Sequence, residues 1–184
     1  MSAPLVVVAI VVLVALSVVV LYNGLIRRRN RIDSAWAQID VQLQRRYDLI
    51  PNLVESVKGY ASHERELFER VAQARTQAMA APATPAARSQ AEQQVTGALR
   101  GLLAVAESNP DLKANQNFLA LQEELVGTEG RIAYARQFYN DTVQDWNTRI
   151  QAFPGRLVAA SFKFTPREYF EADDTSRGPV GVQF

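Results

Sequence analysis

Cysteine is absent from this chain of 184 residues, and histidine occurs only once. Without cysteine there is no disulfide framework, no thiolate metal site and no cysteine nucleophile. A single histidine excludes every metal site that is built on two or more histidines. Acidic and basic residues nearly cancel, leaving a formal net charge of +1. This balance argues against a nucleic-acid-binding protein, which would carry a basic excess.

Catalytic motifs are missing as well. A zinc-protease helix would carry a second histidine four residues after His63, but that position is Leu67, so a histidine on a helix surface is favoured. No Gly-x-Ser-x-Gly occurs, and one histidine makes a general base hard to supply. Several carboxylates on predicted helices lack the Glu-x-x-His partners of di-iron bundles, which favours solvated faces. They are Asp40, Asp48, Glu123, Glu124 and Glu129. We therefore expect no catalytic residue, no cofactor and no metal.

Charged side chains are also absent from the first 26 residues, where residues 5–21 are apolar except for Ser17. About 20 apolar residues at 1.5 Å each span the ~30 Å hydrocarbon core of a bilayer. Fourteen Val, Leu and Ile residues in this run favour insertion by roughly 4–8 kcal/mol in total. Residues 1–26 are therefore predicted to be a transmembrane anchor. The residues assigned to the anchor and its interface are Leu5, Val12, Leu21 and Tyr22.

Two other interpretations of this run are weaker. A signal peptide has its basic residues before the apolar run and small residues at a cleavage site, whereas here the arginines follow. A buried core helix without a polar face is rare in a chain of this size. Because basic residues stay in the cytoplasm, the amino terminus is expected outside and residues 27–184 inside. The flanking arginines are expected to bind anionic lipid headgroups, at about 1 kcal/mol per charge. This arginine collar comprises Arg27, Arg28, Arg29 and Arg31.

After the arginines, apolar residues recur at steps of three and four, which is typical of amphipathic helices. The pattern predicts a helix over 32–74, a helix about half as long that starts at Thr84-Pro85, and a third over 110–153. Short connections make neighbouring helices antiparallel. Two short helices are predicted near the C-terminus. One covers residues 157–162, and the other starts at Thr165-Pro166.

The predicted fold class is thus all-α: a single N-terminal transmembrane helix followed by an elongated antiparallel bundle of three long helices, with short C-terminal helices. The bundle is expected to occupy residues 27–172 in the cytoplasm. Residues 173–184 are charged and contain glycine and proline, so a flexible tail is expected there.

Pro51 lies in the middle of the first amphipathic stretch, where it lacks an amide hydrogen and crowds the carbonyl of Tyr47. Because the apolar stripe keeps its phase on both sides, the sequence predicts a kink and not an end. A carbonyl freed at a kink can bind a partner group, but an internal salt bridge with a cap is the favoured interpretation. The candidate cluster comprises the polar residues Arg45, Arg46, Asp48 and Asn52 around the kink at Pro51.

Several of these segments resemble the LemA family. The longest is Arg45–Val54, which contains Asp-Leu-Ile-Pro-Asn-Leu-Val, and others are Tyr22–Leu25, Ala35–Leu43, Val57–Ala61 and Phe153-Pro154. The resemblance runs from the anchor to the tail. It implies a bacterial protein with one membrane anchor and a helical-bundle domain, and it brings no established catalytic activity. Some relatives are associated with organising membranes, including magnetosome formation.

The function expected from these observations is that of a non-enzymatic scaffold or adaptor in the bacterial cytoplasmic membrane. The short second helix leaves part of the apolar stripe uncovered, which argues for a homo-oligomer or for docking of envelope proteins whose identity the sequence does not give. Membrane organisation or remodelling is the expected context, with the bilayer as partner and no nucleic acid. The alternative is a sensor or ligand-binding bundle with an extracytoplasmic domain, and the two hypotheses differ in topology.

Overall fold

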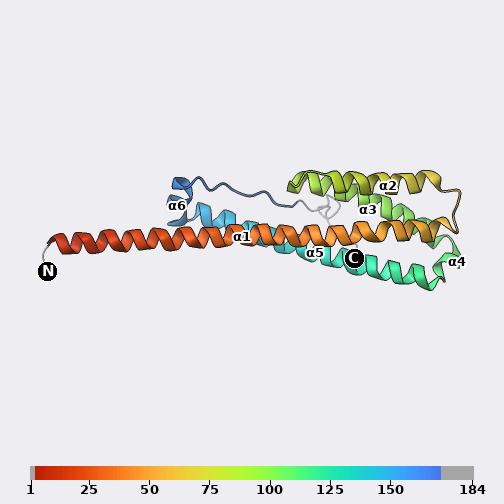
Figure 1. Ribbon diagram of the computed structural model, residues 1–184, viewed down its shortest axis with the longest axis horizontal. Coiled ribbons are helices and arrows are strands. Elements are labelled where there is room, and N and C mark those ends of the chain that lie inside the picture. The colour runs from red at the N-terminus through yellow and green to blue at the C-terminus, as the bar shows by residue number, and fades with distance from the viewer. Residues whose placement is uncertain (1–2, 171–184) are drawn as a thin grey trace, which may run out of the picture. The chain divides into compact units, whose positions relative to one another are not determined.

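The computed structural model describes residues 3–170, which form six helices and no strand, so the predicted all-α class is confirmed (Figure 1). The predicted flexible tail, residues 173–184, lies outside the described residues. The six helices are α1 (Ala3–Lys58), α2 (Arg65–Ala80), α3 (Pro85–Glu107), α4 (Pro110–Lys113), α5 (Gln116–Gln151) and α6 (Gly155–Ser161).

The chain divides into two compact units. The anchor unit comprises Met1–Gln38 and Gln137–Glu168, and the bundle unit comprises Ile39–Arg136 and Tyr169–Phe184. Helices α1 and α5 each contribute residues to both units.

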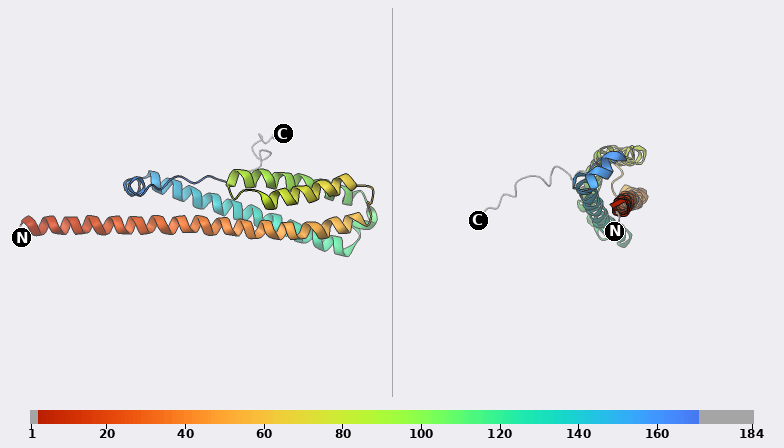
Figure 2. Two further views of the ribbon diagram at one scale, coloured as in Figure 1. Left: turned by 45° about the horizontal axis from the view of Figure 1, so that its top comes forward. Right: turned by 90° about the vertical axis from the view of Figure 1, so that its left-hand side faces the viewer.

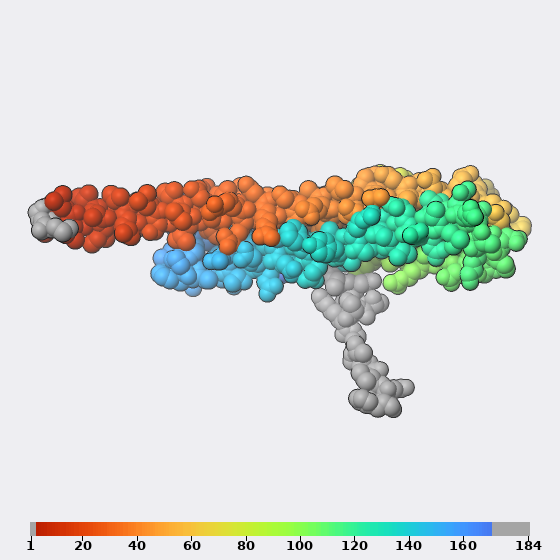
Figure 3. Space-filling model, turned by 90° about the horizontal axis from the view of Figure 1, so that it is seen from below, coloured from red at the N-terminus to blue at the C-terminus, as the bar shows by residue number. Residues whose placement is uncertain are grey.

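The apolar run forms the first part of α1 in the anchor unit. Its most apolar window of 18 residues has a mean hydropathy of 3.3 and no buried residue, so it is not the core helix of a soluble domain. Figure 3 shows this red part of α1 bare on the visible face, with the blue segment of α6 beginning only further along the helix. An exposed apolar helix of this length is suited to a bilayer.

Burial begins at Leu25, and from there α1 packs against α5 within the anchor unit. The Arg28 Nε lies 2.7 Å from Asp145 Oδ2, and the rings of Trp36 and Tyr139 lie 5.3 Å apart between centroids. Higher residue numbers on α1 face lower numbers on α5, so the two helices are antiparallel here, as the sequence predicts.

In the bundle unit, α1 presents the stripe that its periodicity predicts. The buried positions recur at steps of three and four, as one face of a helix requires. They are Ile39, Leu43, Tyr47, Ile50, Leu53 and Val57. Helices α2 and α3 lie side by side in Figures 1 and 2, joined by residues 81–84.

The prediction of one helix over residues 32–74 is wrong at its C-terminal half. Helix α1 ends at Lys58, and α2 begins only at Arg65. Gly59 follows the last helical residue, and glycine is a poor helix former. Tyr60 then closes a turn by donating its backbone N–H to the Val57 carbonyl at 3.0 Å, while its hydroxyl accepts from Asn115 Nδ2 at 3.1 Å.

Two smaller predictions also need correction. The third helix is divided, because Asn115 Oδ1 accepts from the backbone N–H groups of Asn117 and Phe118 at 2.9 and 3.2 Å and so starts α5 after a separate α4. No helix starts at Thr165, since residues 164–170 are not helical. By contrast, α3 begins at Pro85 as predicted, and α6 covers most of the predicted turn over residues 157–162.

Candidate functional site

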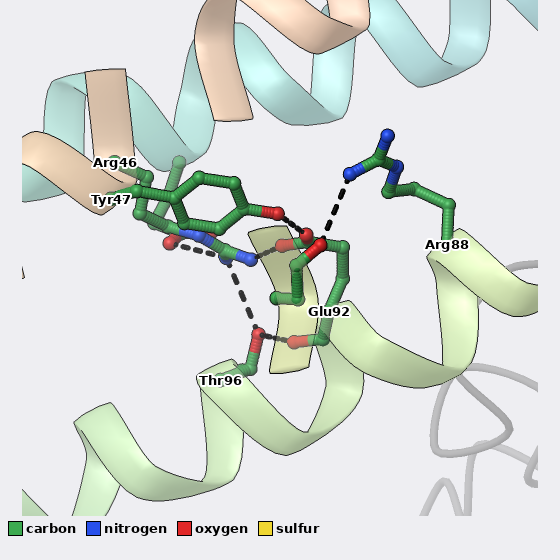
Figure 4. Close-up of polar contacts among 7 residues, drawn as sticks. Arg46, Tyr47, Arg88, Glu92 and Thr96 are labelled. Carbon is green, nitrogen blue, oxygen red and sulfur yellow. Dashed lines mark hydrogen bonds and ion pairs between the residues drawn. The ribbon is translucent and has the colours of Figure 1, made fainter. Parts of the chain in front are cut away.

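A buried polar cluster ties three helices of the bundle unit together (Figure 4). Arg46 on α1 is only 2% exposed and forms an ion pair with Glu92 on α3. Its Nη1 donates to Glu129 Oε1 on α5 at 2.8 Å and to Thr96 Oγ1 on α3 at 3.4 Å. The Tyr47 hydroxyl donates to the same Glu92 carboxylate. We call Arg46, Tyr47, Glu92, Thr96 and Glu129 the Arg46 cluster.

This cluster joins charged groups of α1, α3 and α5 in the interior of the bundle unit, where the Arg46 Nε has no hydrogen-bond partner in the described part of the chain. Removing a charge from water costs several kcal/mol, and a buried pair offsets that cost only when its remaining donors and acceptors are also satisfied. Here one guanidinium contacts carboxylates from α3 and α5, so sliding any of the three helices breaks a contact to a buried charge. Beside it lies a cavity of about 30 Å³, lined partly by Leu43, Arg46 and Ile132. A cavity of this size holds about one or two waters and no larger molecule.

The carbonyl freed by Pro51 has an internal partner. Proline at this position has no N–H for the Tyr47 carbonyl. Arg75 on α2 takes that place, since its Nε donates to the Tyr47 oxygen at 2.8 Å. Helix α1 runs through Pro51 without ending, as predicted. The proline thus creates an acceptor that holds α2 against α1.

The residues of the candidate cluster around Pro51 are not brought into one site. Only Arg46 is buried, and it forms internal ion pairs. Arg45 points to Glu124 at 2.5 Å, and Asp48 Oδ1 accepts from Gln44 Nε2 at 2.8 Å. Pro51 and Asn52 are exposed. Glu92 was not among the residues predicted from the sequence, although it lies three positions before Val95 on the buried stripe that continues to Leu99. A charged residue on such a stripe indicates a buried partner.

No metal centre is found among residues 3–170. These residues contain no group of three or more histidine, cysteine, aspartate or glutamate side chains placed to hold an ion. The single histidine, His63, is exposed in the turn between α1 and α2. Three of the five carboxylates weighed from the sequence have arginine partners: Asp40 with Arg88, and Glu124 and Glu129 with the arginines above.

Two arginines of the arginine collar contact side chains of α5 in the anchor unit, and the other two do not take part in these contacts. Arg28 pairs with Asp145, and the Arg31 guanidinium lies 5.4 Å from the centre of the Phe138 ring. Arg27 and Arg29 are exposed. Among the anchor residues, Leu5 and Val12 are exposed and Leu21 is half-buried.

Tyr22 follows the apolar run and belongs to a cluster of three aromatic rings. Its ring centroid lies 4.6 Å from that of Phe162 and 5.9 Å from that of Phe164. The Tyr22 ring thus packs against residues that follow α6.

An extended segment, which we call the strap (residues 164–168), lies along α5 in the anchor unit. Trp146 Nε1 donates to the Thr165 carbonyl at 3.0 Å. Asn147 makes both hydrogen bonds to the Arg167 backbone, donating to its carbonyl at 3.0 Å and accepting from its N–H at 2.9 Å. Tyr139 donates its hydroxyl proton to the Glu168 carbonyl at 3.0 Å. The sequence showed these side chains on α5 but not their use in binding backbone.

Burial raises the pKa of the Tyr47 and Tyr139 phenols above the ordinary 10.0, because desolvation disfavours the phenolate. Arg46 and Arg88 partly oppose this for Tyr47. The folded chain therefore holds these protons more tightly than the unfolded chain does. This stabilisation is complete below pH 10 and is lost as pH rises through the raised pKa values.

We expect thermal unfolding midpoints, followed by circular dichroism between pH 8 and 12, to fall above about pH 10. Tyr47→Phe with Tyr139→Phe should flatten that fall while lowering the midpoint at pH 8, since Glu92 and the Glu168 carbonyl lose donors. Tyr134→Phe is the matched control, because Tyr134 is 73% exposed. An alkaline fall of unchanged steepness in the double variant would contradict the assignment.

Comparison with known proteins places the chain among membrane-associated helical proteins. A sequence model of the LemA family matches residues 35–184. The chain is 25% identical to Magnetosome protein MamQ 2 of Paramagnetospirillum magneticum, over 86% of this chain and 68% of that protein. It is also 25% identical to Protein LemA of Metamycoplasma hominis, over 86% of this chain and 72% of that protein. Neither name is that of an enzyme.

Proposed function

This chain belongs to the LemA family, and we propose that it is a membrane-anchored, non-enzymatic scaffold that self-associates beneath the bacterial cytoplasmic membrane. The observation that carries the proposal is α1 itself. One uninterrupted helix begins as an exposed apolar segment and ends as the core stripe of a bundle. The same helix thus supplies both the proposed membrane anchor and part of the core of a folded domain.

Orientation follows from charge. The arginine collar directly follows the apolar run, and basic flanks stay in the cytoplasm. The amino terminus is then outside, and the bundle unit and strap are inside. Membrane organisation or remodelling is the proposed context, in keeping with relatives that are named magnetosome proteins.

The surface proposed for self-association is one face of α5 in the bundle unit. Val126 is 66% and Tyr134 is 73% exposed. At 3.6 residues per turn, the members of this face cover about one third of the helix circumference, opposite the buried side that carries Leu125 and Ile132. The α5 outer face comprises Leu119, Glu123, Val126, Gly127, Gly130 and Tyr134.

The two glycines are the informative members of this face. Each glycine in a helix interior costs about 1 kcal/mol relative to alanine. A Cβ added at Gly127 or Gly130 would meet nothing within 4 Å, so packing inside the chain does not require either glycine. Small residues do allow the backbone of a second helix to approach closely, and a second copy of α5 is the partner we propose.

Gly127→Ala with Gly130→Ala should therefore act in opposite directions on folding and assembly. We expect the free energy of unfolding to rise by about 1–2 kcal/mol in total, because helix propensity improves without a clash. Disulfide crosslinking between copies that carry Val126→Cys in native membranes should fall severalfold. The chain has no other cysteine, so the crosslink reports this position alone.

Gly97→Ala on α3 is the matched control, because a Cβ there also meets nothing within 4 Å. It should raise stability to a similar extent per residue and leave the crosslink unchanged. Absence of any dimer crosslink from Val126→Cys, Leu119→Cys or Tyr134→Cys in native membranes would contradict self-association through this face.

A further inference from the structure

We propose that the corner between α5 and α6 is a second membrane-contact site, which inserts at the headgroup level and binds an anionic phospholipid. The α5–α6 corner comprises Arg149, Phe153, Pro154, Leu157 and Phe162. The inference deepens the proposed function and rests on the anchor crossing the bilayer.

The corner lies where α1 leaves the apolar run. A hollow of about 250 Å³ in the anchor unit is lined on α1 by Val20, Leu21 and Leu25, and across from them by residues 152–155. The Tyr22 ring lies 4.6 Å from Phe162 between centroids. Figure 3 shows the blue α6 segment beside the same stretch of α1. If Leu21 ends the hydrocarbon span, the corner sits at the bilayer surface.

The corner presents large apolar side chains outward. Phe153 is 82%, Leu157 is 62% and Phe162 is 51% exposed. If the corner faced water, three large apolar side chains among the ten residues 153–162 would stay exposed, and their exposure would not stabilise the folded chain. Aromatic and aliphatic side chains at the headgroup boundary instead bury their area in lipid, at about 25 cal/mol per Å².

The hollow is basic as well as apolar. Arg27, Arg28 and Arg149 line it. One carboxylate, Asp145, faces Arg28 at 2.7 Å and Arg149 at 3.8 Å. Three cations against one anion leave an excess of two positive charges at an apolar floor. A phospholipid fits both the basic and the apolar lining of the hollow. Its phosphate would contact the arginines, and its glycerol and upper acyl carbons would contact Val20, Leu21 and Phe153.

The test uses the full chain in vesicles, with single cysteines that carry an environment-sensitive fluorophore. Leu157→Cys probes the corner, and Val12→Cys probes the middle of the anchor. Ser34→Cys is the control within the anchor unit, exposed and roughly 20 Å further along α1 than Leu21. Brominated lipids, which quench by contact, are supplied as either phosphatidylglycerol or phosphatidylcholine. We expect quenching at positions 12 and 157 and none at position 34.

Charge dependence identifies the lipid. At position 157, brominated phosphatidylglycerol should quench more strongly than brominated phosphatidylcholine. Arg27→Gln with Arg149→Gln should lower that preference by about fivefold per charge, the equivalent of ~1 kcal/mol each. Soluble glycerol phosphate, added to phosphatidylcholine vesicles, should leave the signal unchanged.

The outcomes separate the two proposals. Quenching at position 12 with none at position 157 overturns the second contact site and leaves the anchor standing. No quenching at either position overturns the anchor and the proposed function with it. Equal quenching by the two lipids overturns the anionic headgroup, and a response to glycerol phosphate assigns the arginines to a soluble phosphate instead.

Discussion

Arg46→Met is expected to lower the free energy of unfolding by about 3–5 kcal/mol, a large share of the roughly 5–15 kcal/mol that holds a domain together. The substitution removes the cation but leaves the Glu92 carboxylate almost fully buried. The Tyr47 hydroxyl is then the main group left to stabilise that charge. Urea-induced loss of helical circular dichroism, measured on the full chain in nanodiscs, gives the comparison with the unsubstituted protein.

The neighbouring residue supplies a matched control. Arg45 also pairs with a glutamate on α5, at 2.5 Å, but the two side chains are 49% and 39% exposed. Water and salt screen such a pair, so Arg45→Met should cost about 0–1 kcal/mol. Equal losses from Arg45→Met and Arg46→Met would show that burial of the Arg46 ion pair does not determine how much the pair stabilises the bundle unit.

Removing the whole set of buried polar groups should undo most of the damage. In the triple variant Arg46→Met, Glu92→Leu, Tyr47→Phe, neither a buried charge nor an orphaned hydroxyl remains at the centre of the cluster. Apolar replacement of a buried ion pair is often neutral or stabilising. If the triple variant recovers stability but shows broadened or multiple conformations by NMR, the cluster contributes register more than free energy.

The sequence predicted the fold wherever one repeated pattern decided it. The apolar run alone was enough to predict the anchor. The spacing of three and four residues from Ile39 to Val57 was enough to predict the core face of α1. The start of α3 at Pro85 followed from the preference of proline for the first helical position, and Thr84 makes no side-chain capping hydrogen bond. These features depend on residues close together in the chain.

Features that depend on distant residues were missed. The stripe of α1 continues in phase into α2, so periodicity alone could not show that the chain turns back at Gly59. The sequence placed Arg46 in the cluster around Pro51 but did not show its carboxylate partners, because they lie 46 and 83 positions further on. Likewise, nothing local shows that Asn147 binds the backbone of Arg167. Such contacts follow from how helices pair, which the sequence pattern leaves open.

Two arginines in the middle of the apolar run are expected to release the chain from the membrane. Val12→Arg with Leu13→Arg costs about 6–8 kcal/mol in bilayer insertion, counting roughly 2.5–3.5 kcal/mol for each arginine and the lost contribution of each apolar residue. The cost matches the roughly 4–8 kcal/mol by which the run favours insertion. The variant should appear outside the membrane pellet after carbonate washing.

The control places the same two charges on apolar residues away from the run. Val41→Arg with Met79→Arg changes residues that are 63% and 47% exposed on α1 and α2, so this variant should stay in the washed membranes. Both variants add the same charge, and a difference between them therefore reports position and not net charge. The released variant should also keep the helical circular dichroism of the bundle unit, because no residue in the most apolar stretch of α1 is buried in the protein. Retention of the Val12→Arg, Leu13→Arg chain in washed membranes would show that contacts other than the apolar run, such as the α5–α6 corner, suffice for attachment.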